Sequence, residues 1–240
     1  MKRTKWTNGT AVMCTLLLAL PSLAMAEGAT IKAKIFWQGK PYKGKRMKNM
    51  NKECTGFHQG TPPRSETVLT NENNTLRNVF VYVKNAPEGD YPVPEEHVVL
   101  DQKGCVYVPR VFGVRVGQML EIHNSDPTAH NIHFTPKKNP EFNKSQPKKG
   151  LIEKMTFKRA EVMVPVKCDV HPWMKAYAGV MKHPFFGASG DDGVVTIEGL
   201  PAGTYELVAW HEKYGTKTRE VTVADGETKK VKFEFSREDG

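Results

Sequence analysis

The chain has few of the features that mark fibrous, disordered or disulfide-rich proteins. Its 240 residues include only 4 cysteines, 16 prolines and 20 glycines, while 39% are hydrophobic and 9% are aromatic. Repeats and low-complexity runs are absent from the sequence. This composition excludes a disordered tail, a collagen and a disulfide-dense miniprotein, and it suits one large or two small globular domains.

Long apolar runs are also lacking, apart from one short stretch at the N-terminus. Three basic residues precede the apolar stretch Ala11 to Leu20, and the small-x-small sequence Ala24-Met25-Ala26 follows it. This pattern predicts a secretory signal peptide at residues 1–26. A membrane anchor is the weaker interpretation, because the stretch is short. We therefore expect a periplasmic or otherwise exported protein with no membrane span in the mature chain.

Removal of the signal peptide changes two counts. Three positive charges leave with it, so the formal net charge falls from +9 to +6, and Cys14 is lost as well. The mature chain keeps Cys54, Cys105 and Cys168, which is an odd number for an oxidising compartment. One free thiol or one intermolecular bond therefore needs an explanation.

Helical patterning is missing too, since no window of helical length holds a 3.6-residue apolar period with start and stop signals. About a dozen short segments instead alternate apolar and polar residues between Gly, Pro, Asn and Asp. They include residues 31–37, 78–84, 105–108, 119–123, 131–135, 161–167, 194–197, 205–210, 220–223 and 230–235. The pattern predicts an all-β protein built from Greek-key sandwiches.

Charge is distributed unevenly along the mature chain. Lys40 to Lys52 has six basic residues and no acidic one, and Lys137 to Arg159 has eight basic against two acidic residues. Phe186 to Gly240 instead has eleven acidic and seven basic residues, and the glycine-rich stretch Gly187 to Gly193 lies near this change. We expect an N-terminal β segment at 27–96, a central domain at 97–185 and a C-terminal β module at 186–240.

The segment from Cys168 to Met174 carries the most informative chemistry. It places a thiolate, an imidazole and a thioether three residues apart, at Cys168, His171 and Met174, directly after an expected strand. Soft sulfur ligands with imidazole select copper or zinc over calcium or magnesium. His130, at the end of a turn where another strand begins, is the candidate second imidazole. Two imidazoles and a thiolate with a weak axial thioether suit copper that cycles between Cu(I) and Cu(II).

The sequence Ala129 to Phe134, followed by Cys-x2-His-x2-Met, resembles the cupredoxins, most closely amicyanin and the plastocyanin-like members with a short ligand loop. The resemblance covers roughly Val98 to His183. It implies a Greek-key cupredoxin sandwich and one copper ion that carries single electrons. The ligands that it implies are His130, Cys168, His171 and Met174.

The resemblance also implies roles around the ligands. The exposed edge of His171 would be the electron port, with an apolar rim that includes Pro172 and Trp173. Asn131 matches the residue that ties the two ligand loops together near the thiolate. Ala176 stands where the family has a glycine two places after the axial Met, which leaves the path of the next strand open.

Each ligand has a simpler alternative. Cys168 could be an inert buried thiol or a disulfide partner, and zinc is the main competing metal, although zinc commonly prefers tetrahedral sites without a thioether. His123 and His133 are weak candidates, since strand alternation points His133 away from the face of His130. A Cys54 to Cys105 disulfide would leave Cys168 free, while Cys54 with His58 could instead seed a second metal site.

The C-terminal region carries a second, less specific resemblance. Its turns and alternating strands from Asp192 to Leu207 are similar to carboxypeptidase-regulatory-like or transthyretin-like β-sandwich modules. Such modules begin with a strand resembling Ala29 to Trp37, so we expect the N-terminal strands to complete this sandwich with the copper domain inserted within it. A plain tandem arrangement is the alternative. The module is expected to act as a scaffold or docking unit.

The function expected from these observations is electron transfer by an exported mononuclear copper protein. The basic stretches would steer it toward an acidic redox protein partner, and export without any nucleic-acid signature argues against nucleic acid. The alternatives are a periplasmic copper-trafficking or buffering protein and a non-redox interaction module. An enzyme is not expected, because no Ser-His-Asp spacing, metalloprotease helix motif or second ligand set is evident.

Overall fold

The computed structural model describes residues 28–240, and the expected signal peptide at 1–26 lies outside this range. The described residues form sixteen strands in four sheets, one five-residue α-helix and one three-residue 3-10 helix, Arg237–Asp239. The predicted all-β fold class is therefore confirmed. None of the helices in this part of the chain has the length and apolar character needed to cross a membrane.

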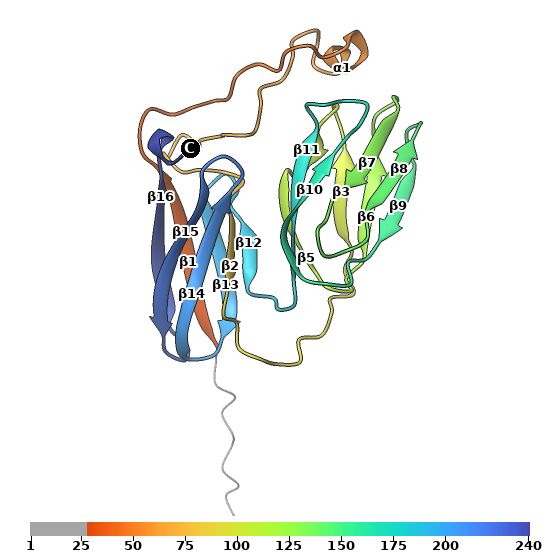
Figure 1. The fold of residues 1–240 in the computed structure, drawn as a ribbon. Coiled ribbons are helices and arrows are strands. Elements are labelled where there is room, and N and C mark those ends of the chain that lie inside the picture. Colours follow the sequence, from red (N-terminus) through yellow and green to blue (C-terminus); the bar gives the residue numbers. More distant parts are fainter. Residues whose placement is uncertain (1–27) are drawn as a thin grey trace, which may run out of the picture.

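One pair of sheets, here called the terminal sandwich, combines strands from both ends of the chain (Figure 1). Its three-stranded sheet has the order β13-β1-β16 and its four-stranded sheet the order β12-β2-β14-β15. The bounds are β1 Ala29–Trp37, β2 Phe80–Val83, β12 Phe186–Ala188, β13 Val194–Leu200, β14 Gly203–His211, β15 Gly215–Val223 and β16 Thr228–Phe235. Every second residue of β1 is buried in the core between these sheets, as the alternating pattern requires.

The other pair of sheets, the central sandwich, consists of the strands between β2 and β12. Its sheets have the orders β5-β11-β10-β7-β8 and β4-β3-β6-β9. The bounds are β3 Val98–Gln102, β4 Tyr107–Val108, β5 Val111–Arg115, β6 Leu120–Asn124, β7 His130–Phe134, β8 Phe142–Gln146, β9 Ile152–Met155, β10 Glu161–Lys167 and β11 Lys175–Met181. Neighbouring β7 and β10 bring residues 130 and 168 to the same end of the sheet.

The terminal sandwich depends on a contact between the two ends of the chain. Strand β1 lies between β13 and β16, antiparallel to the first and parallel to the second, with Ile31 opposite Lys229. Strand β2 likewise lies between β12 and β14. The chain therefore leaves the terminal sandwich after β2, forms all of β3 to β11, and returns to the terminal sandwich at β12.

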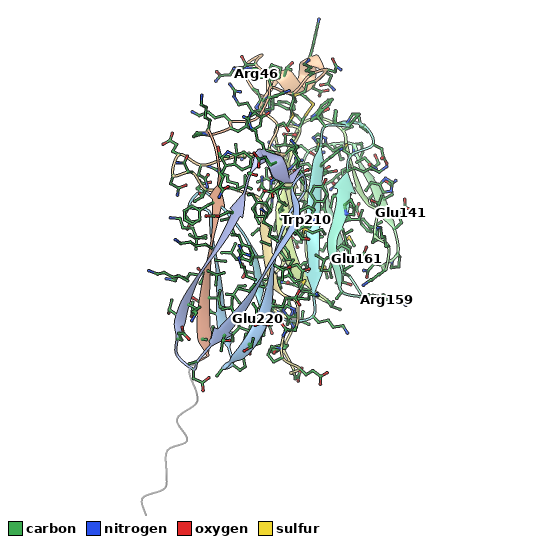
Figure 2. All side chains as sticks on the ribbon, turned by 60° about the vertical axis from the view of Figure 1, so that its left-hand side comes forward. Arg46, Glu141, Arg159, Glu161, Trp210 and Glu220 are labelled. Atoms are coloured by element: carbon green, nitrogen blue, oxygen red, sulfur yellow. A yellow bond between two sulfur atoms is a disulfide. The ribbon has the colours of Figure 1, made fainter. Side chains whose placement is uncertain are left out.

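The two sandwiches meet through aromatic side chains and one buried ion pair. Phe80 of β2 packs against Gly113 of β5 and Gly179 of β11. The Phe80 ring thus occupies the space that a side chain at position 179 would need. The ring centroid of Trp210, which is labelled in Figure 2, lies 5.0 Å from that of Tyr177. Nearby, the guanidinium of Arg110 binds both carboxylate oxygens of Glu212, at 2.6 and 2.9 Å.

A long connection, here called the crossing segment, runs from residue 38 to residue 79. It leaves the terminal sandwich, passes over one end of the central sandwich and returns (Figure 1). Its only regular element among the described residues is α1, Lys52–Gly56, which begins where the Asn51 side chain accepts a hydrogen bond from the Cys54 amide. Cys54 and Cys105 form the disulfide that the sequence left open beside a Cys54–His58 metal site, and this bond attaches α1 to the central sandwich.

The packing of Phe80 predicts a cost for added volume at position 179. In Gly179→Ala the new methyl group would overlap the Phe80 ring, and overpacking of this kind costs about 1–3 kcal/mol of the free energy of unfolding. Gly190→Ala is the matched control, because a methyl group there would meet nothing within 4 Å. Urea denaturation checks the prediction, and equal midpoints for the two variants would contradict it.

Candidate metal centre

His130, the first residue of β7, is fully buried and is held from behind by Asp126. Its Nε2 lies 2.9 Å from Asp126 Oδ2. The same carboxylate accepts hydrogen bonds from the backbone amides of Gly104 and Cys105, at 2.7 and 2.8 Å. An acceptor at Nε2 places the ring proton there and leaves the Nδ1 lone pair available for a metal ion.

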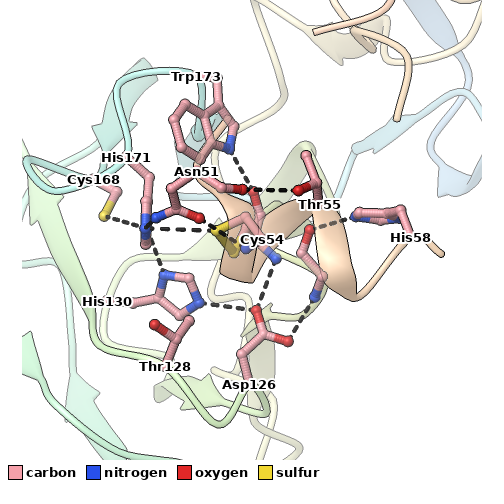
Figure 3. The surroundings of a disulfide bond; sticks show 12 residues. Asn51, Cys54, Thr55, His58, Asp126, Thr128, His130, Cys168, His171 and Trp173 are labelled. Atoms are coloured by element: carbon pink, nitrogen blue, oxygen red, sulfur yellow. Dashed lines mark hydrogen bonds and ion pairs between the residues drawn. A yellow bond between two sulfur atoms is a disulfide. The ribbon is translucent and has the colours of Figure 1, made fainter. Parts of the chain in front are cut away.

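The free nitrogen of His130 points toward two other candidate ligands (Figure 3). His130 Nδ1 lies 3.0 Å from His171 Nδ1, and His171 Nδ1 lies 3.9 Å from Cys168 Sγ. One ligand atom from each of these three buried residues lies within 4.8 Å of the others. The strand and loop positions thus bring two imidazoles and a thiol to one point.

The ligand loop between Cys168 and Met174 is closed by its own backbone. The Met174 amide donates to the His171 carbonyl at 2.9 Å, and the Cys168 amide donates to the Met174 carbonyl at 3.3 Å. Met174, the expected axial ligand, is 1% exposed and belongs to the same hydrophobic cluster as Cys168. Ala176 follows within β11, opposite Val166 of β10, so the next strand continues without the expected glycine.

Two side chains join the strands that carry the ligands. Asn131 Oδ1 accepts from the Asp169 backbone amide at 3.1 Å, and the backbone N–H of Asn131 donates to Cys168 Sγ at 3.4 Å. The predicted tie between the ligand loops is therefore confirmed. The Tyr107 hydroxyl adds a second tie, with the carbonyl oxygens of Asn131 and Lys167 at 2.6 and 3.0 Å. The sequence carried no signal for Tyr107.

The surroundings of the thiol favour its ionised form. Burial raises the pKa of Cys168, but the interaction with neighbouring His130 and hydrogen bonds from backbone amides outweigh burial and hold the pKa below its usual value. Burial and the neighbouring His130 lower the pKa of His171, which favours a neutral imidazole. A thiolate and neutral imidazoles are the forms that bind metal ions.

The donor set fits a soft transition-metal ion. Two imidazole nitrogens and a thiol converge in a buried space, with a thioether residue on the same loop. Oxygen donors are not part of this set, so it does not suit calcium or magnesium. His130, Cys168 and His171 would hold the ion.

The expectation of an exposed edge on His171 was wrong, because the crossing segment covers it. His171 is 2% exposed. Its Nε2 lies 3.3 Å from Asn51 Nδ2 and 3.6 Å from Cys54 Sγ, and the Trp173 ring centroid lies 5.0 Å from that of His171 (Figure 3). The Cys54–Cys105 disulfide, which leaves Cys168 as the free thiol, also holds α1 against His171.

The other histidines near the ligands have different contacts. His133 Nδ1 lies 2.8 Å from Asp169 Oδ2, and its Nε2 contacts Glu141, on the opposite face from His130 as strand alternation predicted. His123 contacts Glu121 at 2.9 Å. His58 Nε2 lies 2.8 Å from the Gly104 carbonyl oxygen, while Cys54 is in the disulfide.

No known protein family, described by its sequence profile, matches the chain, and no curated protein matches it either. Similar solved structures include a mutant of amicyanin in its Cu(I) form, with 23% identity over 42% of this chain and 98% of that one, at a TM-score of 0.32. A purple cupredoxin from Nitrosopumilus maritimus has 19% identity over 35% of this chain and 99% of that one, at a TM-score of 0.31.

A copper-containing nitrite reductase from Thermus scotoductus has 22% identity over 42% of this chain and 25% of that one, at a TM-score of 0.31. All three proteins are cupredoxins or contain copper according to their names, and the matches cover less than half of this chain. Values this low assign no function, which therefore depends on the chain's own residues. The likeness of the C-terminal region to carboxypeptidase-regulatory-like modules stays a prediction.

The double contact of the Tyr107 hydroxyl predicts that Tyr107→Phe weakens the metal centre. The two carbonyl oxygens, one of them buried, lose the hydroxyl hydrogen that they share, which costs about 1–3 kcal/mol of the free energy of unfolding and loosens the join between β7 and β10. Tyr205→Phe is the control, since its hydroxyl contacts only the nearby Pro201 carbonyl in the terminal sandwich. Metal affinity, measured by chelator competition, should fall in Tyr107→Phe alone. Equal affinities would contradict the assigned role.

Proposed function

We propose that the protein carries single electrons between redox partners through one copper ion bound by His130, Cys168, His171 and Met174. The observation that carries the proposal is the meeting of the two Nδ1 atoms and the thiol in one buried space. A bound copper ion would supply the one-electron chemistry. The proposal places the protein outside the cytoplasm and assigns it no catalytic turnover.

The proposal is supported by how firmly the protein holds each ligand from outside the set. Asp126 orients His130, the Asn131 amide contacts Cys168 Sγ, and backbone hydrogen bonds close the loop around His171. Ligands fixed in this way move little when the charge at the centre changes. A small rearrangement is what rapid electron transfer requires, and a buried apolar shell keeps water away from the centre.

The covered state of His171 moves the proposed electron port to Trp173. The Trp173 ring is half-buried and lies beside His171, and its Nε1 donates to the Cys105 carbonyl at 3.0 Å. Electrons would therefore cross the surface formed by Trp173 and the start of α1. No ligand needs to reach solvent for this outer-sphere transfer.

The basic stretch Lys40 to Lys52 lies beside this port, because it contains Asn51, which covers His171, and ends at the first residue of α1. The second stretch is divided between the two ends of the sheet. Lys148 and Lys149 follow Gln146, which pairs with His130, whereas the Lys137 and Lys138 amides bind the Glu161 carboxylate at the opposite end of β10 from Cys168. That strand has seven residues, so the separation is about 20 Å. An acidic partner steered by Lys40 to Lys52 would meet the port.

The burial of His171 beneath the crossing segment also supports a second candidate function, the trafficking or buffering of copper. A closed centre protects a bound ion from solvent and from competing ligands, which suits storage as well as electron transfer. The two functions differ in what leaves the protein. A carrier keeps its ion through repeated oxidation and reduction, whereas a trafficking protein gives Cu(I) to an acceptor.

The ligand assignment predicts distinct effects at Cys168 and Met174. Cys168→Ser should abolish the intense visible absorption of the Cu(II) form, because that colour requires a thiolate donor. Met174→Leu should keep the colour and raise the reduction potential, since a weak donor that favours Cu(II) is lost. Met181→Leu, at the far end of β11, is the control and should change neither property. Visible spectra and voltammetry measure the outcomes, and an unchanged spectrum in Cys168→Ser would show that Cys168 is not a ligand.

The position of the port predicts an effect of charge on one side only. Lys52→Glu should slow reduction of the Cu(II) form by anionic hexacyanoferrate(II) roughly twofold or more at low ionic strength. The helix should tolerate this change, because an acidic residue is favourable in the first turn. Lys158→Glu reverses a charge at the opposite end of β10 and is the matched control. Stopped-flow rates should converge at high salt, and equal slowing by both variants would disprove the location.

A further inference from the structure

The disulfide lies against the face of His171 that the proposed copper ligands do not use. His171 Nδ1 faces His130 and Cys168, whereas Nε2, on the other side of the ring, lies 3.6 Å from Cys54 Sγ. The sulfur atoms of Cys54 and Cys105 and one nitrogen of His171 lie within 4.8 Å of one another. All three residues are buried, Cys54 and Cys105 completely. Two sulfurs and an imidazole nitrogen therefore form a second convergent group.

The hydrogen bonds of Asn51 show how the outer nitrogen of His171 is oriented. Asn51 Oδ1 accepts from the Cys54 amide at 2.8 Å, which directs Nδ2 of the same side chain toward His171 Nε2 at 3.3 Å. An amide NH2 group can only donate, so His171 Nε2 accepts this hydrogen bond and its lone pair points toward Asn51 and α1. That lone pair is directed to the same space as the disulfide sulfurs (Figure 3).

We propose that reduction of the Cys54–Cys105 disulfide creates a second metal site, in which Cys54, Cys105 and His171 Nε2 bind one Cu(I) ion. Two thiolates and an imidazole form a soft, three-coordinate donor set of the kind that selects Cu(I). The site needs neither Cys168 nor His130, so it does not depend on the proposed electron transfer. It shares only His171 with that centre.

The chemistry of the site has two steps. A dithiol reductant gives two electrons and two protons to the S–S bond, which breaks into two thiols, while the dithiol becomes a disulfide. Cu(I) then displaces one proton from each thiol and binds both sulfurs, and the two protons pass to solvent. The copper ion keeps its oxidation state throughout. In the oxidised protein the same sulfurs are joined and hold no metal ion.

The crossing segment gives a reductant a route to the buried disulfide. Within the described residues, the part from 38 to 79 adds no strand to the four sheets, and its pairing is limited to isolated bridges such as Arg46 with Arg64. The contacts of α1 and its flanks with the central sandwich are the hydrogen bonds of Asn51 and His58 and the packing of Met50, Cys54 and Phe57 on its core. Local opening of this short segment breaks no strand pairing, so the S–S bond becomes accessible without unfolding of either sandwich.

The shared histidine places the second ion one imidazole ring away from the first centre. His171 presents Nε2 to the outer sulfurs and Nδ1 to Cys168 and His130. A neutral imidazole offers one lone pair to a metal ion, and it binds two ions at once only after it also loses its remaining proton. Cu(I) that enters at the outer sulfurs would therefore pass inward when His171 exchanges one nitrogen for the other. The disulfide state would decide whether this entrance exists.

The experiment uses the full mature chain with Cys168→Ser, which lacks the thiolate of the inner centre. The protein is reduced with a phosphine, freed of excess reductant without oxygen, and titrated with Cu(I) against bathocuproine disulfonate. The reduced Cys168→Ser chain should bind one Cu(I), and the oxidised chain should bind none. The triple variant with Cys54→Ser and Cys105→Ser added has no disulfide to reduce, and it should bind none after the same treatment. Addition of His171→Ala should weaken binding by about tenfold or more.

Two results would overturn the proposal: equal Cu(I) binding by reduced and oxidised Cys168→Ser, or no effect of His171→Ala. Should reduction unfold Cys168→Ser, as circular dichroism would reveal, a second comparison decides the question. The reduced wild-type chain should bind one Cu(I) more than the Cys54→Ser, Cys105→Ser chain. That double variant keeps His130, Cys168, His171 and Met174, so its Cu(II) colour tests the proposed electron carrier separately.

Discussion

The carboxylate of Asp126 is the point on which the metal centre depends. It binds Nε2 of His130 and the backbone amides of Gly104 and Cys105, so one side chain fixes an inner ligand and one end of the disulfide. These hydrogen bonds lower the pKa of Asp126 against the opposing effect of burial. A negative charge is thereby kept under the centre, where it favours both a correctly oriented imidazole and a bound cation.

The crossing segment links Asp126 to the residues that cover the candidate metal centre. Cys105 is joined to Asp126 through its amide and to α1 through its sulfur, and α1 in turn covers His171. The ligands are therefore enclosed by two parts of the chain that are distant in sequence. Disulfide, carboxylate and histidines form one connected group, in which a change at any member reaches the others through direct contacts. The proposed redox control of metal entry follows from that connection.

The features that could be predicted from the sequence depend on the spacing of residues within one strand or loop. Those that could not be predicted depend on contacts between segments that are distant in the sequence. Strand alternation was enough for the all-β class, whereas the odd count of cysteines made a Cys54–Cys105 bond the simpler account without fixing it. The three-residue spacings around His171 describe a single tight loop, so its closure could be anticipated. The cover formed by Asn51 could not, because it depends on the route of some forty residues that have no periodic pattern. Tyr107 likewise acts through carbonyl groups distant in sequence.

The position of β1 sets the order in which the strands can assemble. This strand emerges first, yet its neighbours β13 and β16 are the products of the last fifty residues. Its apolar face has no sheet to join until synthesis is nearly complete, whereas β3 to β11 are contiguous and can pack beforehand. The central sandwich is thus free to fold early, while β1 must avoid pairing with other chains until β13 and β16 are made.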